Sequence, residues 1–249
     1  MSMVSKVVLV VGGAGSIGAV VAKCFAEIGA RVAISHRDVP EEAAAAQRVV
    51  GSLPGEGHFA AVADVARSDT LTALRGEIEA RCGRLDVLVN AAGFTKPVPH
   101  ADLDGLDDEL IDRMFAVNWR GQFAAIRTFA PLLKASGEGL IVSISSIAGT
   151  NGIGSSIAYC AAKAGIDVMT KSLARVLAPE VRVLAVAPGV VDTQFVPGRG
   201  ADFNQKTAAT TPLKRVATAD DIASAIFACA TQLTFCTGTT IVVDGGRSL

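Results

Sequence analysis

The chain has 249 residues, of which half are hydrophobic and 19% are charged, with 23 Lys and Arg against 24 Asp and Glu. This composition is typical of a compact globular protein and excludes a disordered one. The net charge of −1 leaves no basic surplus for nucleic acid, so no nucleic-acid partner is expected.

The cysteines, the histidines and the first apolar run indicate the compartment of the protein and argue against a metal site. The chain has five cysteines, an odd number, scattered without a C-x-x-C pair, which predicts buried thiols in a reducing compartment. Its three histidines are far apart, so no metal site is expected. The first apolar run, Val7–Val11, is too short to cross a bilayer and follows no charged leader. These patterns predict a cytoplasmic protein without a membrane partner.

Short β-branched runs alternate with segments of helical spacing along the whole chain. The expected strands are Val7–Val11, Arg31–Ser35, His58–Ala63, Asp86–Asn90, Leu140–Ser145, Arg182–Ala187 and Thr240–Val243. The expected helices are Ile17–Ile28, Glu41–Val50, Thr70–Cys82, Asp107–Lys134, Ile157–Leu177 and Ala219–Thr231. Strands that are apolar on both faces and separated by helices predict an α/β fold: a Rossmann-type, doubly wound, seven-stranded parallel sheet with helices on both faces. No linker divides residues 1–249, so one domain is expected.

The first strand leads through a glycine-rich turn directly into a helix. Glycines permit a tight turn and let the backbone approach a pyrophosphate at the helix N-terminus. The string is weak by itself, but its place in a βαβ unit predicts a dinucleotide site. The expected cofactor residues of this turn are Gly12, Gly15, Ser16, Ile17 and Gly18.

The end of the second strand carries the signal for the type of cofactor. An acid there holds the adenosine ribose of NAD, whereas a nearby base holds the 2′-phosphate of NADP. His36 occupies the expected position of the acid and Arg37 follows it, so NADP(H) is favoured over NAD(H). Asp38 is the counter-argument, because a shift of two residues would restore an acid.

Tyr159, the single tyrosine of the chain, stands four residues before Lys163. On a helix this spacing puts both side chains on one face, about one turn apart. A cation roughly 4 Å from a phenol, at an effective dielectric of about 20, favours the phenolate by up to ~4 kcal/mol. That would lower the phenol pKa from about 10 toward neutral pH, where a general acid–base works best. A lysine four residues after a tyrosine can also occur by chance, so this spacing alone is weak evidence for a catalytic pair.

The segment from Gln194 to Pro212 interrupts the alternation of strands and helices. It contains two glycines and two prolines and has little apolar periodicity. Long irregular segments in compact domains are often lids or binding loops, so a substrate lid at 194–212 is favoured over a plain surface loop.

Further short motifs complete a pattern that resembles the short-chain dehydrogenase/reductase family, in its compact single-domain branch. They are Asp64-Val65, Asn90-Ala91-Ala92-Gly93, Asn118, Ser145-Ser146, Pro188-Gly189-Val190-Val191-Asp192-Thr193 and Asp244-Gly245-Gly246. With the glycine turn and Tyr159-x-x-x-Lys163, the resemblance covers essentially the whole chain. Two positions depart from the branch pattern Thr-Gly-x-x-x-Gly-x-Gly, since Val11 replaces the threonine and Ser16 the middle glycine.

The resemblance implies hydride transfer between a nicotinamide and a carbonyl or secondary alcohol. It implies that Tyr159 exchanges the proton on the substrate oxygen and that Ser146 hydrogen-bonds that oxygen. Lys163 would lower the pKa of the tyrosine and bind the nicotinamide ribose, and Asn118 would hold a water that links Lys163 to solvent. The other implied cofactor residues are Asp64 and Val65 beside the adenine, and Asn90, Ala91, Gly93, Pro188, Gly189, Val191 and Thr193 along the groove.

The substrate is less well defined by the sequence than the cofactor. Many chains of this pattern are 3-oxoacyl-carrier-protein reductases, but this chain shows glycine and glutamate, in Ser136-Gly137-Glu138-Gly139 and Ala178-Pro179-Glu180, where those enzymes tend to carry arginine. A small carbonyl or alcohol substrate is therefore favoured, with the carrier-protein substrate as the alternative. The expected pocket residues are Phe94, Ser146, Ile153, Tyr159 and Phe195, with Thr95 and Phe203 beside them.

A second hypothesis is a catalytically silent NADP-binding sensor or scaffold of the same fold. The intact set of Asn118, Ser146, Tyr159 and Lys163 favours the enzyme, because a pure binding module does not need the serine and tyrosine. The resemblance also implies a homotetramer or homodimer, with the segments Asp107–Lys134 and Ile157–Leu177 at its interfaces.

Overall fold

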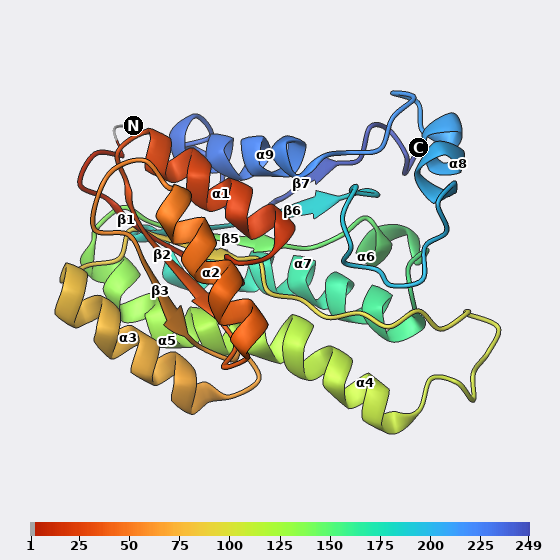
Figure 1. Ribbon diagram of the computed structural model, residues 1–249, viewed down its shortest axis with the longest axis horizontal. Helices are drawn as coiled ribbons and strands as arrows, with labels where there is room; N and C mark the ends of the chain where they lie inside the picture. The colour runs from red at the N-terminus through yellow and green to blue at the C-terminus, as the bar shows by residue number, and fades with distance from the viewer. Residues whose placement is uncertain (1–2) are drawn as a thin grey trace.

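The computed structural model describes residues 3–249, whose strands form one parallel sheet (Figure 1). The strand order is β3-β2-β1-β4-β5-β6-β7, and each neighbouring pair is parallel. The order reverses on the two sides of β1, which is the switch point where doubly wound folds bind ligands. The expected Rossmann-type sheet is confirmed. The strands are β1 (Val7–Val11), β2 (Arg31–His36), β3 (Phe59–Val62), β4 (Val87–Asn90), β5 (Gly139–Ile144), β6 (Val181–Pro188) and β7 (Thr240–Val243).

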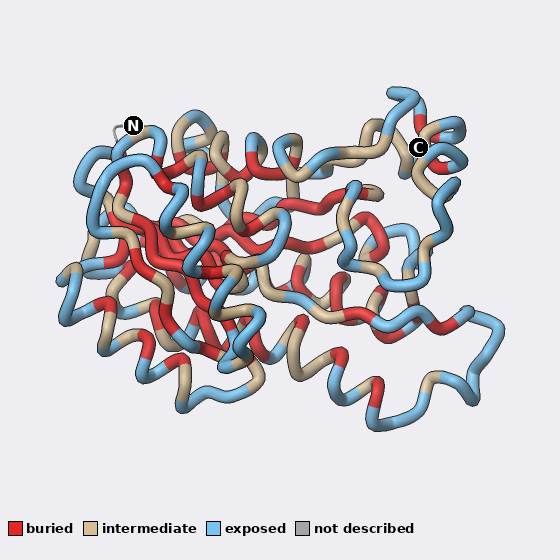
Figure 2. The backbone as a smooth tube through the Cα atoms, in the orientation of Figure 1, coloured by how far each residue is buried: buried red, intermediate tan, exposed pale blue. Residues whose placement is uncertain are grey.

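Helices cover both faces of the sheet. Residues of α1 (Ser16–Glu27), α2 (Pro40–Ser52) and α9 (Ala219–Thr231) share one hydrophobic core. Residues of α3 (Ser68–Cys82), α5 (Gly121–Ala135) and α7 (Ile157–Leu177) share the other. In β1 the side chains alternate between these two cores, as the two-residue period of a strand requires. Figure 2 shows the result, with the buried strands between two layers of partly exposed helices.

The segment expected as one helix over Asp107–Lys134 is divided into three parts. It consists of α4 (Asp108–Phe115), a π-helical turn η1 (Ala116–Arg120) and α5. Asn118 lies in the π-turn and is fully buried, and its amide nitrogen donates to Met114 O at 2.9 Å and to Phe94 O at 2.8 Å. A side chain inserted into the helical hydrogen-bond ladder is a known cause of such an interruption.

Two short helices were not expected from the sequence. α6 (Ala148–Asn151) follows β5, and α8 (Phe203–Thr210) lies within the segment expected to be irregular. The prediction of buried thiols is also only partly right, because Cys160 and Cys229 are buried whereas Cys24, Cys82 and Cys236 are half-buried. Within residues 3–249, no helix has the length and apolar character needed to cross a membrane.

Candidate active site

A cavity of about 1520 Å³ lies at the carboxyl ends of the central strands. It exceeds the roughly 300–1,000 Å³ of an ordinary small-molecule site, so it has room for a dinucleotide and a small substrate together. Three of the residues expected at the site, Asn90, Thr95 and Asn118, lie outside its wall. The others all line it: Gly12, Gly15, Ser16, Ile17, Gly18, His36, Arg37, Asp64, Val65, Ala91, Gly93, Phe94, Ser146, Ile153, Tyr159, Lys163, Pro188, Gly189, Val191, Thr193 and Phe195.

The glycine turn forms one end of this cavity. Gly12 has a φ of +78° and its N–H donates to the Ser35 hydroxyl at 3.2 Å. A Cβ on Gly18 would lie 2.5 Å from Gly12 O, so the turn and the helix approach too closely for a side chain there. Gly15 is the N-cap of α1, which has no side-chain cap and no acid in its first turn. The free N–H groups at this helix end suit a pyrophosphate.

Arg37 lies at the end of the cavity beside β2 and is already paired with an acid. Its backbone N–H donates to Glu42 Oε2 at 3.0 Å, and its Nε donates to Glu42 Oε1 at 2.9 Å. These bonds from Arg37 hold the pKa of the Glu42 carboxyl below its usual value. Glu42 was not expected at the site, because in the sequence it is an ordinary acidic residue in the first turn of a helix.

The two asparagines behind the cavity wall are buried. Asn90 is 1% exposed, and its amide nitrogen donates to the Ser143 hydroxyl at 3.3 Å. Asn118 accepts a hydrogen bond from Phe94 N at 3.1 Å and donates to Phe94 O, so it holds the loop that follows β4. In residues 3–249 the Asn118 amide is fully engaged with protein groups, and its expected role in a proton relay stays a prediction.

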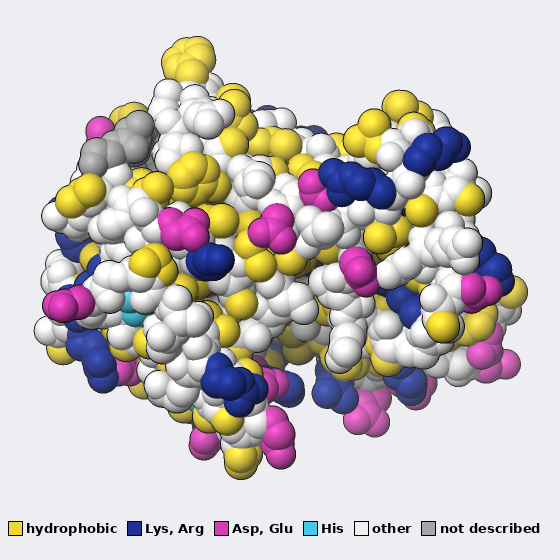
Figure 3. All heavy atoms as spheres, turned by 45° about the horizontal axis from the view of Figure 1, so that its top comes forward, with side chains coloured by type: hydrophobic (Ala, Val, Ile, Leu, Met, Phe, Trp, Pro, Cys, Tyr) yellow, Lys and Arg dark blue, Asp and Glu magenta, His cyan; other side chains and the backbone are white. Residues whose placement is uncertain are grey.

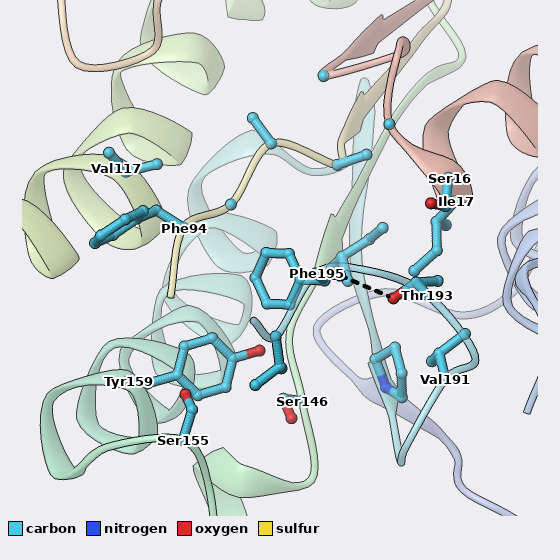
Figure 4. Close-up of a pocket in the computed structure, with 18 of the residues that line it drawn as sticks. Ser16, Ile17, Phe94, Val117, Ser146, Ser155, Tyr159, Val191, Thr193 and Phe195 are labelled. Atoms are coloured by element: carbon cyan, nitrogen blue, oxygen red, sulfur yellow. Dashed lines mark hydrogen bonds between the residues drawn. The ribbon is translucent and has the colours of Figure 1, made fainter. Parts of the chain in front are cut away.

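Tyr159, Ser146 and Lys163 meet at the opposite end from the glycine turn. The phenol and the Ser146 side chain come from α7 and from the end of β5, and Figure 4 shows them on the same side of the cavity. Lys163 is 3% exposed, its Nζ donates to Ile144 O at 2.7 Å, and that nitrogen lies 5.6 Å from the centroid of the Tyr159 ring. The predicted helical pairing of Tyr159 and Lys163 on α7 is therefore present.

The electrostatics of this pair differ from the expectation. Burial raises the pKa of Tyr159 to about 12, and the Ser146 hydroxyl acts in the opposite direction. Burial also lowers the pKa of Lys163 to about 8, against a weaker effect of Asp167. A pKa of Tyr159 lowered toward neutrality by Lys163 is thus wrong for this structure. Both groups lose hydration on burial, which disfavours the charged form of each.

Aromatic side chains line the part of the cavity around Tyr159. The ring of Phe195 lies 6.2 Å from that of Tyr159, across the cavity from Phe94 (Figure 4). Ile153 is 76% exposed at the rim, and Phe203 also lines the wall. Thr95 lies outside the wall and hydrogen-bonds the Ser155 hydroxyl.

Three arginines at the cavity were not expected from the sequence: Arg113, Arg199 and Arg247. Arg113 stacks on Phe94, with the guanidinium carbon 4.3 Å from the ring centroid. Arg199 was the detectable one, since it is a cation between two glycines in the glycine- and proline-rich segment after β6. Arg113 and Arg247 carry no local signal, because their segments look like an ordinary helix and a chain end.

No three His, Cys, Asp or Glu side chains in residues 3–249 are grouped to hold a metal ion. On the face seen in Figure 3, basic and acidic side chains are interspersed.

Comparison with known proteins agrees with this geometry. Residues 12–248 match the family model described as enoyl-(acyl carrier protein) reductase. A cis-4-hydroxycyclohexanecarboxylate dehydrogenase of Sinomonas cyclohexanicum is 38% identical over 97% of this chain and 96% of its own. A crystal structure of a putative short-chain dehydrogenase/reductase from Burkholderia xenovorans superposes with a TM-score of 0.90, at 33% identity over 97% of each chain. A 3-ketoacyl-(acyl-carrier-protein) reductase from Brucella melitensis, complexed with NADH, superposes with a TM-score of 0.88, at 32% identity over 100% of both chains.

Proposed function

Because the chain belongs to the short-chain dehydrogenase/reductase family, whose members exchange hydride between a nicotinamide and a carbonyl or alcohol, we propose that it reduces small carbonyl compounds with NADPH. The observation that carries this proposal is the placement of Tyr159, Ser146 and Lys163 at one end of a cavity whose other end is a phosphate-binding turn. The test is NADPH oxidation by the purified protein with a panel of ketones, compared with the same panel and NADH.

The residues present fit a nicotinamide dinucleotide. The turn at Gly12–Gly18 and the first N–H groups of α1 would hold the pyrophosphate, and Lys163 would reach the nicotinamide ribose. The bound dihydronicotinamide would supply the hydride. Val191 and Thr193 line the wall between the turn and Tyr159, where the nicotinamide would lie (Figure 4).

The raised pKa of Tyr159 suits the phenol to the role of general acid in carbonyl reduction. With a pKa of about 12, the phenol keeps its proton at neutral pH and can donate it to the oxygen of a reduced carbonyl. Ser146 would hydrogen-bond the same oxygen, because its side chain lies beside the phenol. Lys163 would stabilise the phenolate that remains after proton donation, provided that its amine is charged.

This role of Lys163 predicts an alkaline fall in the rate of carbonyl reduction. Burial lowers the pKa of Lys163 to about 8, so the ammonium form is present below that pH and is lost as the pH rises through it. The kcat for reduction should fall roughly tenfold between pH 7 and pH 9, well below the range in which Tyr159 titrates. A pH profile of kcat in buffers of constant ionic strength measures this.

The control for this profile is Lys163→Arg, whose guanidinium stays charged over the whole range. Its overall rate is expected to drop, but the fall between pH 7 and pH 9 should disappear. A wild-type rate that stays level to pH 10 would contradict the proposed role of the amine.

The preference for NADPH over NADH rests on Arg37, with Glu42 acting against it. Arg37 lines the cavity beside the end of β2, where a guanidinium can bind the 2′-phosphate. Glu42 occupies part of that guanidinium and adds a negative charge near the same place. The pair therefore weakens the discrimination that Arg37 would give if it were free.

Replacement of Glu42 by glutamine should sharpen the preference for NADPH. The amide keeps the size of the side chain and removes its charge, so NADPH affinity should rise about five- to tenfold, or roughly 1–1.4 kcal/mol, while NADH affinity changes less than twofold. Fluorescence titration of both cofactors at one salt concentration measures the two dissociation constants.

Glu41→Gln is the matched control, because Glu41 lines the same end of the cavity but has no bond to Arg37 in the described chain. It should leave the ratio of the two affinities within about twofold. An unchanged NADPH affinity in Glu42→Gln would show that Arg37 does not bind the 2′-phosphate.

A second candidate is reduction of 3-oxoacyl-carrier-protein, favoured by the similarity to the Brucella melitensis enzyme. Glu138 is exposed and pairs with Lys6 at 3.6 Å, which gives an acidic carrier little basic surface at that turn. The carrier-linked substrate and its N-acetylcysteamine thioester distinguish the two candidates. A large preference for the carrier-linked form would favour the second.

The proposal also treats residues 1–249 as one domain and the segment 194–212 as a substrate lid. Phe195, Arg199 and Phe203 of that segment line the cavity, and α8 stiffens its second half. The cytoplasmic location and the homotetramer or homodimer stay predictions from the sequence.

A further inference from the structure

The guanidinium of Arg199, at the substrate end of the cavity, makes few hydrogen bonds to the protein. Its Nε is buried and has no hydrogen-bond partner within residues 3–249. Its NH1 makes one long bond to Val191 O at 3.5 Å, and no acid of the described chain lies within ion-pair distance. Arg199 as a whole is half-buried, and a cation that is partly desolvated without an acid partner is normally found with an anion.

The surroundings of Arg199 hold the guanidinium in one orientation. Phe203 covers its face, with the guanidinium carbon 4.3 Å from the ring centroid. The donors of a guanidinium lie in its plane, so stacking leaves them free to bind a carboxylate through two parallel bonds. The cation is also near the catalytic phenol, since it acts to lower the pKa of Tyr159.

Charges on the cavity wall are divided between its two ends. The acids that line it are Glu41, Glu42 and Asp64, which come from α2 and from the end of β3 at the adenosine side. Of the four arginines that line it, Arg37 is paired with Glu42, whereas Arg113, Arg199 and Arg247 have no acid partner in residues 3–249. The substrate end therefore carries a net positive charge that the protein does not neutralise.

We propose that Arg199 binds a carboxylate of the substrate, so that the substrate class is a small oxo acid whose ketone is placed against Tyr159 and Ser146. This inference rests on the proposed reductase function. The carboxylate would satisfy the free donors of Arg199, and the aromatic side chains Phe94 and Phe195 would contact the carbon skeleton between the two groups. In the reaction the ketone carbon gains a hydride from the dinucleotide and its oxygen gains the Tyr159 proton, while the carboxylate is unchanged.

The test compares oxo acids with their methyl esters, which differ in the charge that Arg199 would bind. Suitable pairs are pyruvate, 3-oxobutanoate, 4-oxopentanoate and 4-oxocyclohexanecarboxylate with the corresponding esters. The wild-type protein should prefer the acid in at least one pair, and the length of that acid reports the span from Arg199 to Tyr159. In Arg199→Met, kcat/KM for that acid should fall about 100-fold, or about 2.7 kcal/mol, while the value for the ester changes less than threefold.

Two further variants and a cofactor titration separate this role from a structural one. Arg199→Lys keeps the charge without the two parallel bonds and should recover part of the preference for the acid. Lys206→Met removes a cation from the same segment that pairs with Asp202 and lies outside the cavity wall, so it should leave the acid-to-ester ratio unchanged. The dissociation constant for NADPH should stay within threefold in Arg199→Met.

Three results would overturn the carboxylate site. A wild-type protein that reduces the esters better than the acids would exclude it and leave the reductase function standing. Equal losses for acid and ester in Arg199→Met, together with weaker NADPH binding, would assign Arg199 to the cofactor. Failure to reduce any acid or ester with NADPH or NADH would overturn the proposed function together with this inference.

Discussion

Replacement of Tyr159 by phenylalanine is expected to lower kcat for carbonyl reduction about 10²- to 10⁴-fold, which is the rate acceleration that a general acid usually contributes. The ring stays in the first turn of α7 and keeps its place 6.2 Å from Phe195, so the cavity keeps its shape. What is lost is the proton that the phenol, with its pKa raised to about 12, holds at neutral pH. Single-turnover oxidation of NADPH measures the effect, and a fluorescence titration should show unchanged NADPH binding.

Ser155→Ala is the control for this variant. Ser155 lines the same end of the cavity, but its hydroxyl is engaged with Thr95. Removal of the Ser155 hydroxyl should change kcat less than fivefold, whereas loss of the proton donor at Tyr159 should lower kcat at least about 100-fold. A Tyr159→Phe protein with more than a tenth of the wild-type rate would mean that another group donates the proton.

Replacement of Gly18 by alanine should damage both the fold and the cofactor site. The new Cβ would lie 2.5 Å from Gly12 O and 2.8 Å from Gly13 Cα, and both are backbone atoms that cannot turn aside. Helix α1 must then move away from the turn, at a cost of about 1–3 kcal/mol. We expect a melting temperature lower by roughly 3–10 °C and an NADPH affinity reduced at least about tenfold.

Gly15→Ala is the matched control for this substitution. Gly15 has a φ of −76°, and a Cβ there would lie 3.4 Å from Gly12 O, which is an ordinary contact. The melting temperature of this variant without cofactor should therefore stay within about 3 °C of the wild-type value. If Gly15→Ala is stable but binds NADPH weakly, the backbone at Gly15 closely approaches the pyrophosphate. Equal stability of Gly18→Ala and the wild-type protein would contradict the turn geometry.

Several features of this protein could be predicted because they depend on residues close together in the chain. The β-branched runs and helical segments determine the strand and helix order, and the glycines between β1 and α1 determine the tight turn. The four-residue spacing of Tyr159 and Lys163 puts both side chains on one face of α7. Boundaries were less accurate, since the end of a strand depends on its neighbours in the sheet.

Other features depend on contacts between segments that are distant in the chain, and only the tertiary structure decided them. The Asn118 amide meets Phe94 from another loop and interrupts what the periodicity predicts as one long helix. Arg199 lines the same cavity as Tyr159 although forty residues separate them, since the segment after β6 packs against the start of α7 through Phe195. The spacing of residues along the chain does not predict contacts between segments that are distant in the sequence.

The sequence by itself determined the sheet, the tight glycine turn between β1 and α1 and the helical pairing of Tyr159 and Lys163, and it singled out Ser146 as their expected partner. The tertiary structure decided the charge state of that set and the partners of the arginines around it. The physical reason is that local spacing determines which side chains share a helix face, whereas burial determines whether they are charged. Lys163 close to Tyr159 suggests a lowered phenol pKa, but burial of the phenol raises its pKa to about 12, and burial of the amine lowers the pKa of Lys163 to about 8.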